Sequence, residues 1–436
     1  MRALFYGLGL TLAGVPAVGQ TAKPAFVTSD IDHFWAAYDQ IVRTPDSARQ
    51  YDYLNRLFIA KGSPGLRALM DVRAYTPRSY LRAINQYPLF WQSVRANTRK
   101  AAGFAKEIEA GVAKLQQLYP PLKPATVYFT IGALRSGGTT QNGNVLIGSE
   151  IALADQTTVT TEFPPEMAAS RSRYFATNPI RDVVLLNVHE YVHTQQKPLV
   201  QNLLSQALYE GVAEFVSVTA TGQPSALPAV AFGQAHAATV LARFEYDMFR
   251  VNKTPHWLWS DAPNTFQVRD LGYYVGYAIC ERHYAAADKK LAIKEMIELD
   301  YENEAQIEQF VDATKCFSQP LQALHAAFEQ QRPQVVGIKP FPNGSQQVDP
   351  RVTRLTIEFS QPMDVQNRGF ELGPLGEAAL LRVGNFLGFS ADGKAATFEI
   401  ALQPNRRYQV LPSWRFRTAD GLPIGPYLID FRTAAE

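Results

Sequence analysis

Cysteine is scarce in this sequence, whose 436 residues include only Cys280 and Cys316. The chain can therefore form at most one disulfide bond, and two buried free thiols fit the sequence nearly as well. An excess of charge is also lacking, because 42 basic residues are balanced by 40 acidic ones, which leaves a formal net charge of +2. We therefore expect no nucleic-acid partner. No apolar run reaches about 18 residues, so we expect no membrane-spanning helix in the mature chain.

The first 19 residues have the pattern of a secretory signal peptide. Arg2 precedes an apolar run over residues 4–15, and small residues follow before Gln20. This order of basic, apolar and small residues predicts removal of residues 1–19 and a mature start near Gln20. A buried N-terminal helix or a membrane anchor is the alternative, but the apolar run is too short to span a bilayer. We therefore expect an exported protein, in the periplasm or the extracellular space.

The composition, with 46% hydrophobic and 19% charged residues, is that of a folded globular protein with room for two or three domains. Residues 31–118 carry apolar side chains at helical spacing. The next segment, from Val127, has two strands joined by a glycine-rich loop over residues 136–143. We expect further helices near residues 181–196, 201–220, 232–249, 270–286, 287–299 and 318–330. These patterns predict an α+β chain with a mainly helical domain over residues 20–330.

From Gln331 the sequence becomes rich in Pro, Gly and polar residues, and alternating strands such as RLTIEFS, AATFEIAL and RYQVLPS follow. The alternation predicts an all-β sandwich over residues 331–436. The phrase IKPFPNGSQQVDPRVTRLTIEFSQPMD resembles the opening of a bacterial immunoglobulin-like (Ig-like) domain, and this resemblance covers residues 334–433. It implies a spacer or a module that binds an envelope partner, without catalytic residues of its own.

The segment RDVVLLNVHEYVHTQQ contains His189, Glu190 and His193 in the pattern HExxH. A spacing of four residues on an α-helix brings both imidazoles onto one face, where their neutral nitrogens can bind one Zn²⁺. Glu190 then lies beside the metal and can act as the general base toward a zinc-activated water. The alternative is a pair of histidines on a packed helix, but burying these polar groups without a metal or partners is costly.

A zinc enzyme needs a third protein ligand and an open fourth position. The next helical segment, LYEGVAEF, offers Glu210 and Glu214 on one face. It resembles the EGxAE element of gluzincin peptidases, in which the first acid binds zinc and the second supports a histidine ligand. The resemblance implies Glu210 as the third ligand and Glu214 as the acceptor that fixes the ring of His189 or His193. The short gap after HExxH keeps Glu214 open as the ligand instead, and two solvated glutamates are a further alternative.

Residues 31–328 as a whole resemble a family of predicted bacterial zinc-dependent proteases that includes a lipoprotein of the gliding machinery. The segments that carry the resemblance are IDHFWAAYD, VYFTIG with its glycine loop, NVLIGSE, HEYVH, EGVAEF and DLGYYVGYAICERHY. The resemblance implies a zincin-like fold, while substrates in that family are poorly defined. Together with the ligand set, it predicts one zinc ion per chain.

Peptide hydrolysis develops an oxyanion, which gluzincins commonly stabilise with a Tyr or His opposite the zinc. The segment DLGYYVGY offers three tyrosines, of which Tyr273 and Tyr277 share a helix face while Tyr274 points elsewhere. We expect Tyr277 to be catalytic, with Tyr273, Tyr274 and then His283 as the other candidates. Aromatic residues at this spacing also fit the core-facing side of a helix.

The strand GNVLIGSE has a functional interpretation as well. In zincins, the edge strand beside the active-site helix binds an extended peptide by backbone pairing. We therefore expect one wall of a substrate cleft to be formed by Asn144, Val145, Leu146, Ile147 and Gly148. Residues 136–143 would then form a flexible lip. A plain hairpin is the alternative.

These residues together predict an exported zinc metallopeptidase that hydrolyses peptide bonds in a peptide or protein substrate. A second hypothesis is a catalytically silent envelope assembly protein that keeps the zincin fold as a scaffold and binds partners through the sandwich. The presence of Glu190 favours the enzyme, since a scaffold has no need of a general base. A zinc hydrolase acting on a non-peptide amide or ester fits the same site chemistry.

Overall fold

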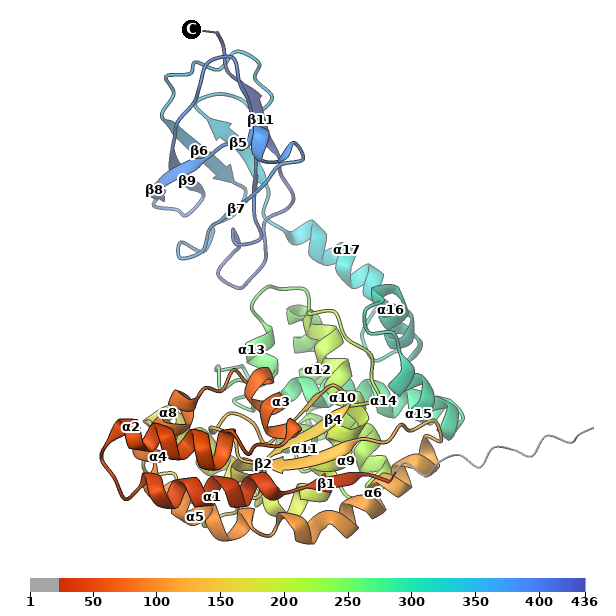
Figure 1. Ribbon diagram of the computed structural model, residues 1–436. Coiled ribbons are helices and arrows are strands. Elements are labelled where there is room, and N and C mark those ends of the chain that lie inside the picture. Colours follow the sequence, from red (N-terminus) through yellow and green to blue (C-terminus); the bar gives the residue numbers. More distant parts are fainter. Residues whose placement is uncertain (1–22, 436) are drawn as a thin grey trace, which may run out of the picture. The chain divides into compact units, whose positions relative to one another are not determined.

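A computed structural model describes residues 23–435 (Figure 1). The predicted signal peptide over residues 1–19 lies outside the described residues. The pattern of internal contacts divides the chain into two compact units. The first comprises the chain up to Gln195 together with Val216–Ala226, and the second comprises Gln196–Phe215 together with the chain from Leu227 onward.

A four-stranded sheet organises the first unit, in the order β1-β2-β4-β3. Its strands are β1 (Ala25–Val27), β2 (Thr126–Thr130), β3 (Gly138–Gln141) and β4 (Asn144–Gly148). The first three strands in this order are parallel, whereas β3 runs antiparallel to β4. A two-residue turn at Asn142 and Gly143 joins β3 to β4, and both residues have positive φ, at 51° and 71°. This conformation suits a tight hairpin turn and the Asn-Gly pair that forms it.

The position of β4 corrects one expectation. We expected Asn144–Gly148 to be an edge strand, but this is wrong, because β4 lies between β2 and β3. The physical reason is that the glycine-rich stretch before β4, expected to be a loop over residues 136–143, is a loop only in part. Residues 138–141 of that stretch form a strand that pairs along the whole of β4. The edge strand on this side of the sheet is therefore β3.

The helices of the first unit pack on both faces of the sheet. They are α1 (Ser29–Ile41), α2 (Ser47–Leu54) with a π-helical continuation (Asn55–Ile59), α3 (Pro64–Val72), α4 (Pro77–Gln86), α5 (Pro88–Thr98), a 3₁₀ turn (Ala101–Phe104), α6 (Ala105–Leu118), α7 (Ser149–Ala152), α8 (Pro165–Ala176), a second 3₁₀ turn (Pro179–Asp182) and α9 (Val183–His193). Several of these helices begin at a capping residue. The side chain of Asp46, for example, accepts hydrogen bonds from the backbone N–H groups in the first turn of α2.

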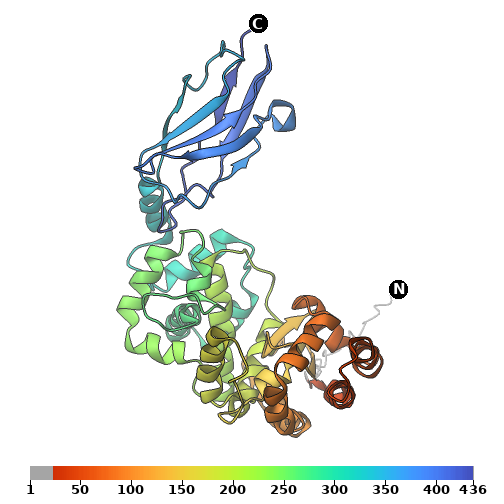
Figure 2. The ribbon, with the colours of Figure 1, turned by 90° about the vertical axis from the view of Figure 1, so that its left-hand side faces the viewer.

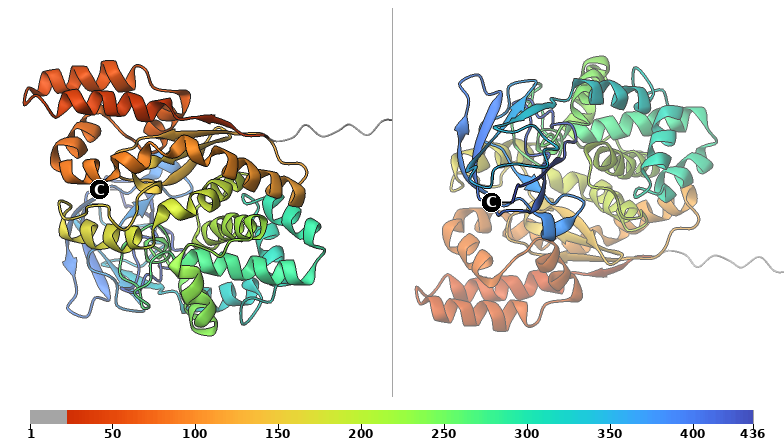
Figure 3. Two further views of the ribbon diagram at one scale, coloured as in Figure 1. Left: turned by 90° about the horizontal axis from the view of Figure 1, so that it is seen from below. Right: turned by 90° about the horizontal axis from the view of Figure 1, so that it is seen from above.

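The alternation of side chains along the strands shows which helices cover which face. Tyr128 of β2 packs so closely on Gly65 of α3 that a Cβ there would lie 2.1 Å from its ring. The opposite face carries Gly138 of β3, which faces Glu190 of α9. Because successive residues of a strand point to opposite faces, α3 and α9 lie on different sides of the sheet (Figure 3). Helix α9 is therefore held between the sheet and α6, which it also contacts.

The helical part of the second unit contains most of the remaining helices. They are α10 (Leu203–Thr221, of which residues 203–215 belong to this unit), α11 (Pro228–Ala235), α12 (Ala237–Asp247), α13 (Thr254–Trp257), α14 (Leu271–Ala286), α15 (Lys289–Glu298), α16 (Glu304–Ala313) and α17 (Leu321–Gln331). The single helix expected over residues 232–249 is two helices that separate at His236, and α16 was not expected. Among the described residues, no helix combines the length and the apolar character needed to cross a membrane.

Only strands and short turns follow α17, and they form two antiparallel sheets (Figures 1 and 2). One has the order β5-β6-β9-β8 and the other the order β11-β10-β7. The strands are β5 (Val335–Lys339), β6 (Arg354–Phe359), β7 (Phe370–Glu371), β8 (Val383–Phe389), β9 (Ala395–Ile400), β10 (Arg407–Pro412) and β11 (Ile429–Arg432). Their inward residues form one apolar core that includes Leu355, Phe398 and Phe431. The predicted α+β class, helical first and β at the C-terminus, is confirmed.

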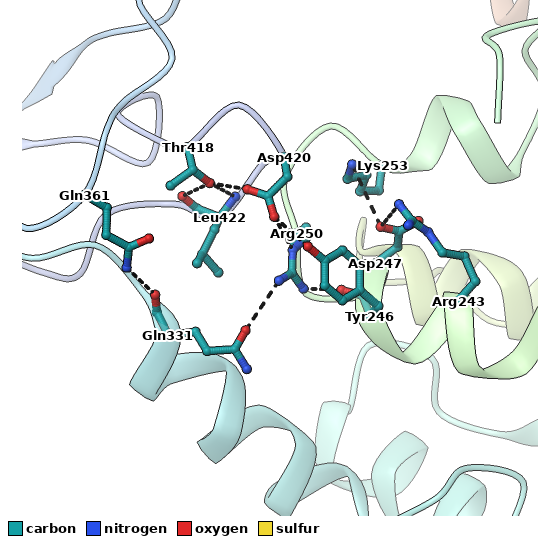
Figure 4. Close-up of polar contacts among 10 residues, drawn as sticks. All are labelled: Arg243, Tyr246, Asp247, Arg250, Lys253, Gln331, Gln361, Thr418, Asp420 and Leu422. Atoms are coloured by element: carbon teal, nitrogen blue, oxygen red, sulfur yellow. Dashed lines mark hydrogen bonds and ion pairs between the residues drawn. The ribbon is translucent and has the colours of Figure 1, made fainter. Parts of the chain in front are cut away.

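Polar contacts join the β-strand region to α12 within the second unit (Figure 4). Asp420 accepts hydrogen bonds from the Tyr246 hydroxyl at 2.7 Å and from Nε of Arg250 at 3.4 Å. The backbone N–H of Val251 donates to the carbonyl of Gly421 at 3.0 Å. The loop that carries Asp420 is therefore held to α12 by hydrogen bonds and an ion pair.

Cys280 and Cys316 are free, buried thiols in this structure. Burial raises the pKa of the Cys316 thiol to about 11 and that of Cys280 well above its usual range. Neither side chain is a thiolate at neutral pH, so both behave as small apolar core residues.

Candidate metal centre

The HExxH residues lie in the last turns of α9, and all three side chains are buried. Nε2 of His189 lies 3.1 Å from Nε2 of His193, with the two rings nearly perpendicular. Two nitrogens that bind one tetrahedral zinc ion at about 2.1 Å lie about 3.4 Å apart. The observed separation is close to that value, so the helix presents the two imidazoles at a spacing that suits a single ion.

Glu210 completes a group of three side chains that could hold a metal ion. One ligand atom from each of His189, His193 and Glu210 lies within 4.8 Å of the other two. Two neutral imidazoles and one carboxylate match the donor set of catalytic zinc sites, which leave a fourth position open. The chemistry of the residues therefore fits zinc. Glu214, one turn after Glu210 on α10, is buried at 4% exposure.

The carboxylate of Glu190 lies against the edge strand. An added Cβ on Gly138 of β3 would come within 2.4 Å of Oε1 of Glu190 and within 2.9 Å of its Cδ. Only a residue without a side chain leaves room there for this carboxylate. Gly138 was not among the expected site residues. Its signal in the sequence is that it opens the four-residue strand that leads into the Asn-Gly turn.

A pair of glycines fixes the neighbourhood of Glu210. A Cβ on Gly211 of α10 would lie 2.2 Å from the backbone carbon of Gly276 on α14, and a Cβ on Gly276 would lie 2.0 Å from the carbonyl oxygen of Ala207. The two helices therefore touch backbone to backbone, which only glycine permits. This crossing explains the glycines of EGVAEF and YYVGY. It brings the tyrosines of α14 close to the acids of α10.

Tyr273 is the tyrosine that reaches the candidate ligand. Its hydroxyl forms a hydrogen bond with the Glu210 carboxylate, and burial together with the negative charges of Glu210 and Asp270 raises its pKa well above the usual range. Nε1 of Trp259 also lies 3.1 Å from the Tyr273 hydroxyl. Tyr273 was one of four candidates expected from the sequence, whereas Trp259 was not expected, because no motif gives a signal for it.

The other expected oxyanion donors have different surroundings. Tyr277 packs edge-on against Phe215, with ring centroids 5.1 Å apart, and burial and the charges of Glu281 and Glu214 raise its pKa to about 12. Tyr274 packs onto Gly233 of α11. Nε2 of His283 lies at hydrogen-bond distance, 2.8 Å, from Oε2 of Glu295 on α15. The structure thus brings Tyr273, rather than these three residues, into hydrogen-bond contact with Glu210.

Comparison with known proteins adds no family. No model of a protein family matches the chain, and no curated protein gives a significant match. Two crystal structures of the bacterial S-layer protein SbsC are matched at 13% and 12% identity, each over 93% of this chain and with a TM-score of 0.18. The chain spans 44% of the first of these structures, less than half its length, and 77% of the second, which is the N-terminal part. A TM-score this low carries no argument about fold or function.

Proposed function

We propose that the chain is an exported zinc metallopeptidase of the gluzincin type with a zincin-like catalytic region. His189, His193 and Glu210 would hold one zinc ion, and Glu190 would act as the general base. The observation that carries the proposal is the convergence of these three ligand atoms within 4.8 Å, on helices that also present Glu190. The resemblance of HEYVH and EGVAEF to gluzincin elements supports the same conclusion.

A zinc ion bound by these residues supplies a Lewis acid that polarises a scissile carbonyl and lowers the pKa of a water molecule. Glu190 would carry out the proton transfers. Its carboxylate accepts a proton from the attacking water and then donates it to the leaving amine nitrogen. The backbone of β3, beside this carboxylate, excludes solvent from one side of it and keeps it in place. Among the tyrosines of α14, Tyr273 has its hydroxyl bonded to the proposed ligand Glu210, and Tyr277 would serve as the donor to the oxyanion.

Strand β3 is the wall along which we propose that the substrate binds, in place of β4. An edge strand presents backbone N–H and C=O groups outside the sheet, to which an extended peptide can add as a further strand. On β3 the Gly138 carbonyl already accepts from Ser136 Oγ at 2.6 Å and from Nη2 of Arg73 at 3.3 Å, so a peptide would have to share or displace these contacts. Because Gly138 of β3 faces Glu190, a peptide paired with β3 would carry its backbone past the general base. The C-terminal strands, which resemble an Ig-like domain, would then act as a spacer or as a module that binds an envelope partner.

Metal content tests the proposal directly. The mature chain from Gln20, a His193→Ala variant and a Glu190→Gln variant would be purified and analysed by mass spectrometry under non-denaturing conditions. We expect about one zinc ion per chain in the parent protein, its loss in His193→Ala, and its retention in Glu190→Gln, because Glu190 is not a ligand.

A second assay separates the enzyme from the scaffold. Cleavage of a fluorescence-quenched peptide library should require both zinc and Glu190. Absence of metal from all three proteins would overturn the proposed centre. Zinc binding without any cleavage of the library would instead support the envelope assembly protein.

A further inference from the structure

Three side chains near the proposed centre form a directional chain of hydrogen bonds. Nε1 of Trp259 lies 3.1 Å from the Tyr273 hydroxyl, and that hydroxyl is bonded to the Glu210 carboxylate. The indole N–H can only donate, and an ionised carboxylate can only accept. The Tyr273 oxygen must therefore accept from Trp259, which leaves its single proton to be donated to Glu210. The indole thus fixes the direction of the hydroxyl.

Hydrogen bonds brace the loop that carries Trp259. It runs from α13 to α14, and the N–H of Trp259 donates to Oδ1 of Asp270 at 2.6 Å, which closes the loop at its base. Within it, Nδ2 of Asn264 donates to the carbonyls of His256 and Val268 at 3.1 and 2.7 Å. The loop therefore has a fixed internal framework.

The backbone conformation and the exposure of Trp259 are both unfavourable for the stability of the fold. Its φ is +56°, in the left-handed region that side chains other than glycine rarely adopt, and Asp270 at the other end of the loop has a φ of +62°. The side chain is also 49% exposed, so much of the apolar gain from burying an indole is lost. Strained backbone of this kind persists where the surrounding structure enforces it and is concentrated at functional sites. The hydrogen bond that the Trp259 side chain makes is the one to the Tyr273 hydroxyl.

We infer that Trp259 is a positioning residue, which orients the proposed metal ligand Glu210 through Tyr273. This inference rests on the proposed zinc centre. A carboxylate ligand can rotate about its last bond, and a hydrogen bond from an outer group fixes the oxygen that faces the metal. Loss of such partners typically weakens metal binding by about 10-fold to 100-fold. The loop between α13 and α14 would therefore set the affinity of the centre without touching the metal.

Zinc affinity, measured by competition with a chromophoric chelator, tests this inference in the full mature chain. Tyr273→Phe removes the hydroxyl and keeps the ring, while Trp259→Phe removes the indole N–H and keeps an aromatic side chain. We expect Tyr273→Phe to weaken zinc binding by about 10-fold to 100-fold and Trp259→Phe by about 10-fold. Because Trp259 acts through Tyr273, the double variant should bind zinc no more weakly than Tyr273→Phe alone. Trp414→Phe is the matched control, since Trp414 is 47% exposed and lies among the C-terminal strands.

A spectroscopic measurement separates positioning from general loosening of the fold. The absorption bands of a bound cobalt ion, substituted for zinc, depend on ligand geometry and should shift in Trp259→Phe and Tyr273→Phe but not in Trp414→Phe. Urea unfolding of the metal-free proteins should show similar stabilities for all of them. If the parent protein binds zinc but both variants keep its zinc affinity and cobalt spectrum, this inference alone is overturned. Additive losses of affinity in the double variant would also overturn it. A parent protein without zinc would overturn the proposed centre and this inference together.

Discussion

Replacing Gly138 with alanine would test how strand β3 controls the proposed general base. A Cβ at this position would lie 2.4 Å from Oε1 of Glu190 and 2.9 Å from its Cδ. An ordinary contact needs about 3.4 Å, so the carboxylate must retreat by about 1 Å to admit the methyl group. A displacement of that size at a reacting group costs about 100-fold in rate. We therefore expect kcat to fall about 100-fold.

The same substitution should leave folding and metal binding nearly intact. The clashing atoms are Oε1, Cδ and Cγ of the Glu190 side chain and no backbone atom, and Gly138 does not have a positive φ. A Gly→Ala change at a compatible position usually alters stability by less than about 1 kcal/mol. Zinc content should remain about one ion per chain, since the three ligands are elsewhere.

The assay would compare steady-state cleavage of the best library peptide, zinc content and urea unfolding for Gly138→Ala and for a control. Gly103→Ala is a suitable control, because a Cβ at Gly103 would meet no atom within 4 Å. Full kcat in Gly138→Ala would refute the reasoning that β3 holds the Glu190 carboxylate in place. Loss of zinc would show that the methyl group disturbs the ligands and not the base.

Three other substitutions probe individual contacts in the fold. Gly211→Ala should lower the free energy of unfolding by about 1–3 kcal/mol in urea denaturation, because its Cβ would lie 2.2 Å from the backbone of α14; an unchanged midpoint would contradict the close crossing. Burial raises the pKa of Glu150 to about 6, so the folded state binds its proton more tightly than the unfolded state does, and stability should fall by about 2 kcal/mol as pH rises from well below 4.5 to well above 6. Glu150→Gln should remove that pH dependence, and an equal slope in both proteins would count against it. Asp420→Asn should weaken the contact to Tyr246 and speed proteolysis near residues 332–334, whereas cleavage at the parent rate would show that this contact does not hold the strands to α12.

Features that depend on local spacing were predicted well from the sequence. The four-residue spacing of His189 and His193 places them on one face of any helix, and α9 lies within the helix expected over residues 181–196. The change from helical to alternating patterns at Gln331 marks the end of α17 and the start of the strands. Each of these expectations uses residues that are neighbours along the chain.

Features that depend on distant contacts could not be predicted in the same way. Tyr273 and Tyr277 share a helix face, and the one that reaches Glu210 is decided by where α14 crosses α10. Residues 136–143 were expected to form a loop, whereas tertiary pairing makes residues 138–141 a strand and sets the strand order that puts β3 at the edge. Trp259 reaches Tyr273 only because the loop closes onto Asp270, and no local pattern encodes that closure.

The crossing of α10 and α14 at Gly211 and Gly276 has a mechanical consequence. Helices that touch through side chains can slide by small changes of rotamer, whereas two backbones in direct contact have no side chains between them that could adjust. The segment of α10 that carries Glu210 and the turn of α14 that carries Tyr273 should therefore move together as one rigid unit. Any motion of this part of α10 would carry the Glu210 carboxylate together with its hydroxyl partner Tyr273.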